Sequence, residues 1–281
     1  MQLAVASQRS GAPRSRVRGG AGARTTDESV NPLSFIEVSK SFDGVHALSA
    51  VTASLTAGRI VGLIGDNGAG KTTFIRLATG ILRPSNGEVR LLGRVADRNE
   101  PELMTRVGAL IETPGHYEEL TAAENLRFAF AFYHRRAPQG TVEGVVRSQL
   151  RSFGLEAVAD TPVGRLSSGF RQRLAVARAA HPWADVVLLD EPFVNLDPVV
   201  RIGIKQQLRE LKAAGKLVVF SSHTLSDVEQ LTDEILLLVA GRLYRFEDFA
   251  AIRRLVGKAA EDDPDAVYAA LHQAMSARED T

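Results

Sequence analysis

Hydrophobic residues along this chain follow two spacings in turn: alternation or short runs, typical of strands, and three-to-four-residue steps, typical of helices. The strand patterns lie at residues 35–39, 51–55, 60–64, 88–92, 107–111, 186–189, 217–220 and 235–239. Helical patterns stand between several of them, at residues 71–80, 168–180, 199–213 and 225–231. Strands that alternate with helices predict an α/β fold with a largely parallel sheet covered on both faces.

The middle of the chain departs from this alternation. From Ala122 to Phe153 the apolar residues keep a helical spacing. We therefore expect a helical insertion at about residues 113–181, inside an α/β domain that spans residues 31–246.

Both ends of the chain differ from this domain. Residues 1–30 contain five arginines and no periodic apolar pattern, so they predict a disordered, arginine-rich tail. At the other end, residues 247–281 predict a helical extension. Its later part contains an Asp263-Pro264 pair typical of a helix start, followed by one apolar face made of Val267, Leu271 and Met275.

Composition excludes several classes of protein. With 34 basic and 33 acidic residues the net charge is +1, which argues against a globally basic nucleic-acid binder. The absence of cysteine excludes disulfide bonds and thiolate metal sites. The longest apolar runs, at residues 186–189 and 235–240, are far shorter than the roughly 18 residues of a membrane span.

The clearest chemical signal is GDNGAGKTT at residues 65–73, which fits the phosphate-binding pattern G-x-x-x-x-G-K-[ST]. It stands between a strand pattern and a helix pattern, where backbone N–H groups and a helix N-terminus can surround an anion. We expect Lys71 to reach the β- and γ-phosphates of a nucleotide, and the Thr72 hydroxyl to bind Mg²⁺. The predicted binding residues of this loop are Gly65, Asn67, Gly68, Gly70, Lys71, Thr72 and Thr73.

Two adjacent acids follow the apolar run at residues 186–189. A buried strand there would present Asp190 beside the glycine loop, where a carboxylate can hold Mg²⁺. Glu191 is placed to orient or deprotonate the water that attacks the γ-phosphate. Adjacent acids are also common at solvated strand ends, and it is the glycine loop that favours the catalytic interpretation.

Residues 166–173 read LSSGFRQR and open the helix pattern before these acids. They resemble the signature motif of the ABC-transporter ATPases, whose usual form is LSGGQ. Further motifs of that family follow in order, because Asn195-Leu196-Asp197 resembles the D-loop and Ser222-His223 resembles the switch histidine. The resemblance covers about residues 35–244. It implies an α/β P-loop NTPase fold with a RecA-like parallel-sheet core, an antiparallel β portion and an inserted helical subdomain.

The resemblance also implies how individual residues act on ATP. Ser167 and Gly169 would complete the ATP site of a second subunit in a head-to-tail dimer. The helix N-terminus that carries them is by itself a second site for an anion. His223 would contact the γ-phosphate, and Phe42 would stack on adenine. Packing of Phe42 in the core at a strand end is the alternative.

One position stands out against the family pattern. Most members have a glutamine at the end of the strand after the glycine loop, where it touches Mg²⁺ and the water, and here it is Glu112. We expect this carboxylate to act in catalysis, metal binding and coupling to the membrane subunit while Glu191 remains the main base, with Mg²⁺ or Lys71 compensating its charge. An exposed acid at a strand end is the alternative. Residues 107–126 resemble the bacitracin-resistance and lantibiotic-immunity branch, whose members expel peptide antibiotics from bacterial membranes.

These expectations describe an ATP-hydrolysing nucleotide-binding subunit of an ABC exporter, with ATP and Mg²⁺ as its ligands. The resemblance implies a separate transmembrane permease, contacted by the helical insertion and the loop near Glu112, and a second ATPase subunit in a homodimer or heterodimer. No specific nucleic acid is expected as a partner. The subunit would be cytoplasmic and held at the inner face of the plasma membrane by the permease. The alternative is a non-transport ABC ATPase that acts on DNA or ribosomes.

Overall fold

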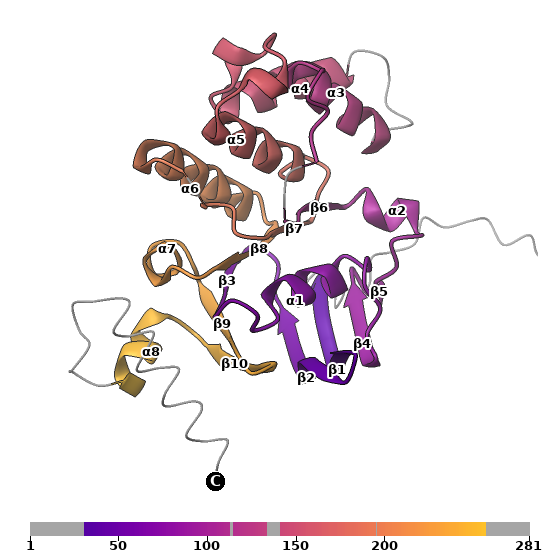
Figure 1. Cartoon of the computed structure of the whole chain (residues 1–281), viewed down its shortest axis with the longest axis vertical. Helices are drawn as coiled ribbons and strands as arrows, with labels where there is room; N and C mark the ends of the chain where they lie inside the picture. Colours follow the sequence, from indigo (N-terminus) through magenta and orange to yellow (C-terminus); the bar gives the residue numbers. More distant parts are fainter. Residues whose placement is uncertain (1–30, 113–114, 134–140, 195, 257–281) are drawn as a thin grey trace, which may run out of the picture.

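Two β-sheets organise the chain in the computed structural model, which describes residues 31–112, 115–133, 141–194 and 196–256 (Figure 1). The larger sheet has the strand order β10-β9-β3-β8-β7-β6. Its strands are β3 (Ile60–Gly65), β6 (Val107–Leu110), β7 (Val186–Leu189), β8 (Leu217–Ser222), β9 (Glu234–Val239) and β10 (Arg242–Phe246). All neighbours are parallel except β10, which runs antiparallel to β9.

The smaller sheet is antiparallel and has the order β2-β1-β4-β5. Its strands are β1 (Leu33–Phe42), β2 (Val45–Leu55), β4 (Asn86–Leu91) and β5 (Arg94–Val95). The sheet packs on helix α1 (Lys71–Ala78), where the rings of Phe35 and Phe74 stack with their centroids 4.0 Å apart. The antiparallel portion therefore supports the helix that follows the glycine loop.

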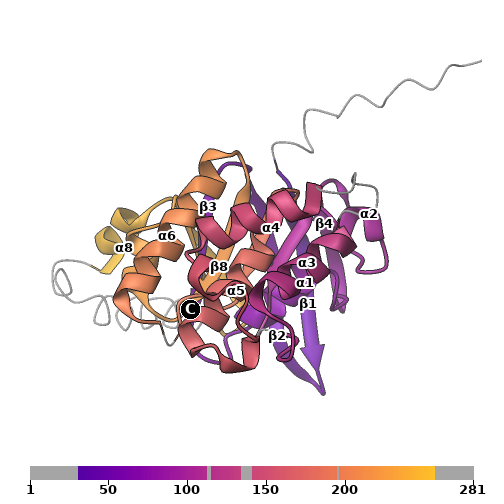
Figure 2. The ribbon, with the colours of Figure 1, turned by 90° about the horizontal axis from the view of Figure 1, so that it is seen from above.

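The remaining helices surround the larger sheet, and those between residues 122 and 179 lie at the end of the molecule away from the antiparallel sheet (Figures 1 and 2). They are α2 (Pro101–Met104), α3 (Ala122–Tyr133), α4 (Thr141–Ser152), α5 (Ser168–Ala179), α6 (Pro198–Ala213), α7 (Leu225–Glu229) and α8 (Phe249–Val256). Helices α3, α4 and α5 pack on one another, and the far end of α5 packs on β6 and β7. A Cβ at Gly108 in β6 would overlap the carbonyl oxygen of Ala179, so this approach requires glycine.

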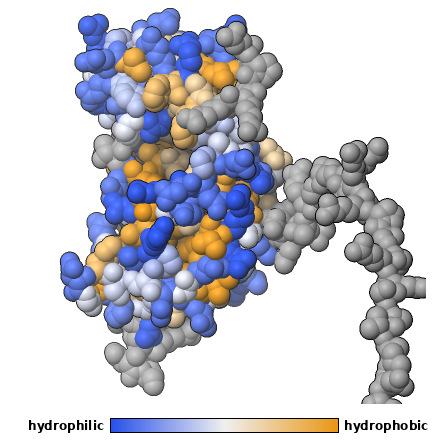
Figure 3. Space-filling model, turned by 90° about the vertical axis from the view of Figure 1, so that its right-hand side faces the viewer, coloured by the Kyte–Doolittle hydropathy of each residue, from blue (hydrophilic) through white to orange (hydrophobic). Residues whose placement is uncertain are grey.

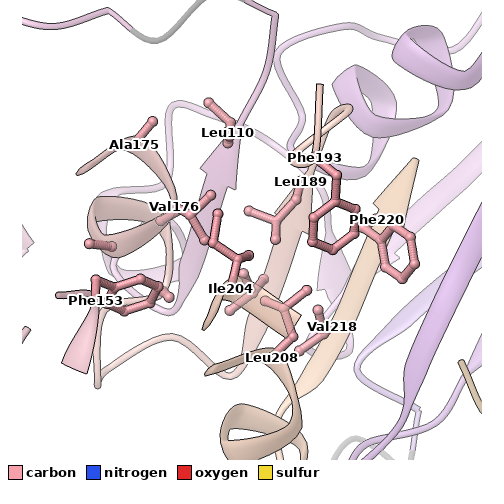
Figure 4. Packing of buried hydrophobic residues seen from close by; sticks show 14 of the residues in the cluster. Leu110, Phe153, Ala175, Val176, Leu189, Phe193, Ile204, Leu208, Val218 and Phe220 are labelled. Carbon is pink, nitrogen blue, oxygen red and sulfur yellow. The ribbon is translucent and has the colours of Figure 1, made fainter. Parts of the chain in front are cut away.

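Side chains of the parallel strands alternate between two hydrophobic clusters. Along β7, Val186 and Leu188 join the cluster that contains α1 and the antiparallel sheet. Val187 and Leu189 join the other cluster, which contains α5, α6 and α7. Figure 4 shows the second cluster at close range, with Leu189 among residues from neighbouring strands and helices. The expected sheet with two covered faces is confirmed.

Most expected strands and helices agree with the structure within a few residues, but the short elements β5 and α2 were not predicted. Strands β1 and β2 extend toward each other to Phe42 and Val45, forming a hairpin longer than the apolar alternation indicates. Strand β10 was not predicted, because its sequence RLYRF is an edge strand with two exposed arginines. Of the expected C-terminal helix, α8 is present and residues 257–281 lie outside the described residues, as do residues 1–30.

No helix among the described residues combines the length and apolar composition needed to cross a membrane. This agrees with the short apolar runs in the sequence.

The segment before α3 owes its shape to polar side chains. Thr121 and Glu124 form a capping box, in which the Thr121 hydroxyl accepts from the Glu124 N–H at 3.2 Å and the Glu124 carboxylate accepts from the Thr121 N–H at 2.8 Å. The buried Asn125 amide bonds both backbone groups of Tyr117 and also the Leu120 carbonyl. Residues 120–126 therefore have a structural role, because they hold the turn that carries Tyr117.

His181, fully buried behind β6, makes the stability of the fold depend on pH. It stacks on Tyr133 with the ring centroids 4.2 Å apart, and its Nε2 bonds the Val107 carbonyl at 3.3 Å. Burial lowers the pKa of His181 from 6.5 to about 4. Between these values the unfolded chain binds a proton that the native ring does not, so stability falls as the pH drops through this window.

We predict a loss of about 3 kcal/mol of unfolding free energy between pH 7 and pH 4 from this residue alone, at about 1.4 kcal/mol per pKa unit. Urea unfolding at a series of pH values measures it. His181→Phe keeps the stacking ring and should flatten the slope, whereas His46→Phe, at an exposed histidine, should keep it. Equal slopes for His181→Phe and the native chain would contradict this assignment.

Candidate active site

The glycine loop lies between β3 and α1, as the sequence predicts, and its glycines meet steric demands. Gly70 is the N-cap of α1 with φ 106°, and a Cβ there would lie 2.5 Å from the Ala47 carbonyl oxygen. Gly68 also has a positive φ, of 86°. Because Gly70 has no side chain to cap the first-turn N–H groups, these groups stay available for an anion.

Lys71 lies inside this loop. Its side chain is 7% exposed, and Nζ donates to the carbonyl oxygens of Gly65 at 2.7 Å and Asp66 at 3.1 Å. Nζ also lies 3.7 Å from Oε1 of Glu191, which comes from the end of β7. The structure therefore brings together the loop lysine and the glutamate that the sequence predicts as the base.

Thr72 and Asp190 meet across the gap between α1 and β7. The Thr72 hydroxyl donates to Oδ2 of Asp190 at 2.8 Å, and Asp190 is almost fully buried. Hydroxyl and carboxylate oxygens are the ligands that Mg²⁺ prefers, usually with one or two carboxylates, substrate phosphates and waters completing its shell. Thr72 and Asp190 would hold the ion, so the oxygen donors present fit the expected Mg²⁺.

Two side chains hold Glu191, Ser221 at its backbone N–H and His223 at its carboxylate. Its N–H donates to the Ser221 hydroxyl at 2.8 Å, and its φ of 47° turns the chain sharply away from β7. Its Oε2 lies 2.9 Å from Nδ1 of His223, which follows β8. The structure thus places His223 on the carboxylate of Glu191, where it can orient this group.

Glu112 follows β6 and lies in the same cleft as Asp190 and Glu191. Its carboxylate pairs with the guanidinium of Arg76, from the last turn of α1. Sequence reasoning expected Mg²⁺ or Lys71 to compensate this charge, and in the structure Arg76 does so. The pair is half-exposed, so it contributes little to stability, but it holds the carboxylate against the helix of the glycine loop.

Phe42 lies at the tip of the β1–β2 hairpin. Its ring is 43% exposed, which does not match the core-packing alternative, and the Lys40 ammonium lies 5.1 Å from the ring centroid. The same hairpin passes the glycine loop, because the Ala47 carbonyl is the atom closest to a Cβ at Gly70. An exposed aromatic ring on a hairpin beside a phosphate loop is suitable for stacking on a base.

Ser167 and Gly169 lie at the start of α5, on either side of Ser168, which lines a cleft of about 480 Å³ together with Glu112, Asp190 and Glu191. Ser167 is the N-cap, and its hydroxyl accepts weakly from the Phe170 N–H at 3.4 Å. Both residues are at least partly exposed. The α5 N-terminus is therefore accessible to an anion, as expected. Of the predicted D-loop, Asn195 lies outside the described residues, and Asp197 caps α6 through the N–H groups of Val199 and Val200.

Sequence reasoning missed two residues that organise these groups. Ser221, at the end of β8 and fully buried, donates to Oδ1 of Asp190 at 2.6 Å while accepting from the Glu191 N–H. Arg76 holds Glu112. A serine that ends an apolar strand next to the strand bearing the acids was a usable signal for Ser221. For Arg76, the helical repeat of α1 indicates on which face of the helix the side chain lies. It does not indicate that the side chain pairs with Glu112.

Comparison with known proteins decides the family. A family model described as "ABC transporter" matches residues 48–194, which is more than half of the chain and includes the glycine loop, the signature and both acids. The chain belongs to the ABC transporter family. The expected ABC ATPase cassette is confirmed by this membership.

Curated relatives of this ABC cassette include export proteins. It is 33% identical over 213 residues to the bacitracin transport ATP-binding protein BcrA of Bacillus licheniformis, covering 74% of this chain and 66% of the relative. It is 33% identical to the Nod factor export ATP-binding protein I of Burkholderia lata, covering 76% of this chain and 69% of the relative. The chain thus spans only about two thirds of their length.

Solved structures confirm the fold of the cassette. A structure described as the ATP-binding subunit of an ABC transporter aligns with a TM-score of 0.75 at 30% identity, covering 85% of this chain and 98% of that one. The ATP-binding cassette MJ0796, in a dimeric post-hydrolysis state bound to ADP and Pi, aligns with a TM-score of 0.72 at 25% identity, covering 76% and 98%. The P-loop NTPase fold with a parallel sheet is therefore confirmed.

The bridging position of Ser221 in the cassette leads to a testable prediction. Ser221→Ala removes the hydrogen bond to Asp190 and leaves the Glu191 N–H without its acceptor, at about 1–3 kcal/mol for such a buried loss. We expect the Mg²⁺ concentration at half-maximal ATPase activity to rise several-fold. Ser222→Ala is the matched control, because this neighbour is equally buried but bonds Thr224. Equal Mg²⁺ dependence of the two variants would refute the role of Ser221.

Glu191→Gln tests the base. The amide keeps the size of the side chain but cannot take a proton, so turnover should fall by about 10²-fold or more while ATP binding persists. Equilibrium ATP binding and steady-state phosphate release measure the two effects. Glu210→Gln, on the exposed side of α6, should change neither. Undiminished hydrolysis in Glu191→Gln would shift the base to Glu112 or His223.

Proposed function

We propose that this chain is the nucleotide-binding subunit of an ABC exporter that expels antibiotics, peptide antibiotics above all, through a separate membrane permease. The observation that carries the ATPase part is the convergence of Lys71, Glu191 and His223 next to the Thr72–Asp190 pair. The relatives named for bacitracin transport and Nod factor export support the direction of transport. As such a subunit it would be cytoplasmic, held at the inner face of the plasma membrane by the permease.

The proposed mechanism uses the geometry of the cassette. The loop N–H groups and Lys71 would bind the phosphates of ATP, and Thr72 with Asp190 would hold Mg²⁺, which would supply charge neutralisation. Glu191 takes the proton of the attacking water, and His223 keeps its carboxylate oriented. Positioning and charge stabilisation are most of what phosphoryl transfer requires from a protein, and these residues supply both.

Phe42 would stack on the adenine of the same ATP. The ring is exposed on the hairpin that borders Gly70, so a nucleotide bound in the glycine loop can extend its base toward it. Stacking would replace exposed apolar surface on both partners, and the Lys40 ammonium near the ring adds a positive charge close to the nucleotide.

A groove of about 520 Å³ lies between β6, α3 and α5 and is here called the aromatic groove. It supports a permease as the partner. Among the aromatic residues that line it, Tyr117, Phe128 and Phe132 are each more than half exposed. The rings of Tyr117 and Phe128 lie edge to face with centroids 4.9 Å apart. On the side of the molecule in Figure 3, apolar surface is exposed within the helical part. Aromatic residues exposed in a groove are typical of a protein interface.

A second ATPase subunit, the same chain or a related one, would pair head to tail with this one. The N-terminus of α5, with Ser167 and Gly169, is an exposed anion site and can complete the ATP site of the partner. Near it, Val194 and the α6 residues Val199 and Ile202 expose apolar side chains. The dimeric MJ0796 structure supports the pairing of such cassettes.

Tolerance of cells to antibiotics tests this function. In a host that lacks the native gene, the wild-type chain and Glu210→Gln should restore tolerance to bacitracin or another peptide antibiotic, and Glu191→Gln should not. The chain should co-purify from membranes with a hydrophobic partner. Tolerance that does not depend on the gene would reject antibiotic export. Association with ribosomes or DNA instead of membranes would favour the non-transport alternative.

Glu112 is proposed to serve coupling to the permease, because it lines the catalytic cleft just after β6, the strand whose Ala109 lines the aromatic groove. Glu112→Gln keeps a side-chain oxygen that would be available to Mg²⁺, so it should preserve ATP binding and most basal hydrolysis. Glu112→Ala removes this oxygen and the Arg76 ion pair, and should lower antibiotic tolerance more than it lowers ATP affinity.

Measuring tolerance in cells and ATP affinity of the purified protein separates these effects. Glu119→Ala, an exposed acid in the following loop, is the control and should change neither. Full tolerance with Glu112→Ala would eliminate the coupling role. Loss of ATP binding with Glu112→Gln would show that the charge acts in nucleotide capture.

A further inference from the structure

His116 connects two sites that the sequence motifs treat separately. It lines the catalytic cleft together with Glu112 and Glu191, and it also lines the aromatic groove together with Tyr117 and Phe128. Its ring is partly buried, in contrast to the exposed side chains of Tyr117 and Glu118 beside it. A residue shared by both linings is well placed to relate what happens in one to the other.

The contacts of this segment run along α5. Nε2 of His116 lies 2.9 Å from the carbonyl oxygen of Arg171, in the first turn of the helix. The guanidinium of Arg178 donates to the carbonyl of Gly115. The backbones of Arg171 and Arg178 stand two turns apart on α5, and both residues contact the consecutive residues 115 and 116, one through its carbonyl and the other through its long side chain.

The chemistry of the ring determines which atom donates. Burial, with Arg178 and Arg171 nearby, lowers the pKa of His116 below 6.5, so the ring is neutral at pH 7. A carbonyl oxygen only accepts, so Nε2 carries the hydrogen and Nδ1 is a bare acceptor. Nδ1 is buried and has no hydrogen-bond partner among the described residues. Within the part of the chain that the structure describes, the Arg171 carbonyl is therefore the one hydrogen-bond partner of this ring.

We propose that His116 is a positioning residue. It ties residues 115–117, which line the aromatic groove, to the N-terminal end of α5, which carries the signature motif. The first turn it contacts begins one residue after Ser167 and includes Gly169, which the proposed dimer presents to the ATP of the partner subunit. If a permease docked in the aromatic groove and shifted residues 115–117, the displacement would reach the N-terminal end of α5 through His116. The inference rests on the proposed function and deepens it.

The test distinguishes the effect of the N–H donor of His116 from the effect of the volume of its ring. His116→Gln retains an N–H donor at a similar reach, whereas His116→Phe fills the space without one. Both are made in full-length chain carrying Glu191→Gln, so that ATP is bound but not consumed. Two quantities are measured for each: the Kd for Mg·ATP, and the protein concentration at which ATP produces half dimer on size exclusion. Glu119→Ala, a surface variant of the same loop, is the control.

We expect His116→Phe to raise the protein concentration at half dimer about 3- to 10-fold, because this is the change in affinity that the loss of one neutral hydrogen bond produces. The Kd for Mg·ATP should stay within about twofold of the parent. His116→Gln should restore dimerisation, and hydrogen exchange should rise in the first turn of α5 with His116→Phe but not in α1. Parent-like dimerisation and exchange with His116→Phe would overturn the proposal, as would a loss confined to thermal stability. If the parent itself forms no ATP-dependent dimer, the head-to-tail dimer of the proposed function fails, and hydrogen exchange still decides whether His116 holds α5.

Discussion

The buried carboxylate of Asp190 is the group on which the catalytic geometry depends. It accepts hydrogen bonds from Thr72 of α1 and from Ser221 of β8, so three elements meet at one side chain. Ser221 in turn accepts from the Glu191 N–H, which positions the proposed base one residue beyond the proposed metal ligand. A buried acid of this kind is tolerated because each of its oxygens has a hydrogen-bond donor.

Packing explains why these bonds can form at all. Five parallel strands end at the same edge, and their side chains alternate between two hydrophobic clusters that anchor each strand from both faces. Strand ends held in this way leave Asp190, Ser221 and the loop before α1 little freedom to separate. Glu112, at the end of the neighbouring β6, joins the same edge and is held by Arg76 from α1. The charges thus gather where the sheet brings the strand ends together.

The helical layer extends this arrangement outward. Helix α5 has one end packed on β6, where only glycine at position 108 permits the approach, and the other end facing the cleft with Ser167 and Gly169. The contacts of His116 and Arg178 lie along its length and reach to the aromatic groove. A single helix therefore contacts the sheet, the cleft and the groove. A change in the orientation of α5 would thus alter both the cleft and the groove, and could couple them.

By itself the sequence determined the alternation of strands and helices, the glycine loop and the adjacent acids, because these depend on local spacing and on side chains a few residues apart. It did not predict β10, an edge strand whose exposed arginines break the apolar pattern. Tertiary structure alone decided that Arg76 pairs with Glu112, that Ser221 bridges Asp190 and Glu191, and that His116 contacts α5. Such partners lie 30 to 55 residues apart along the chain, and only the packing of strands and helices brings them within hydrogen-bond distance.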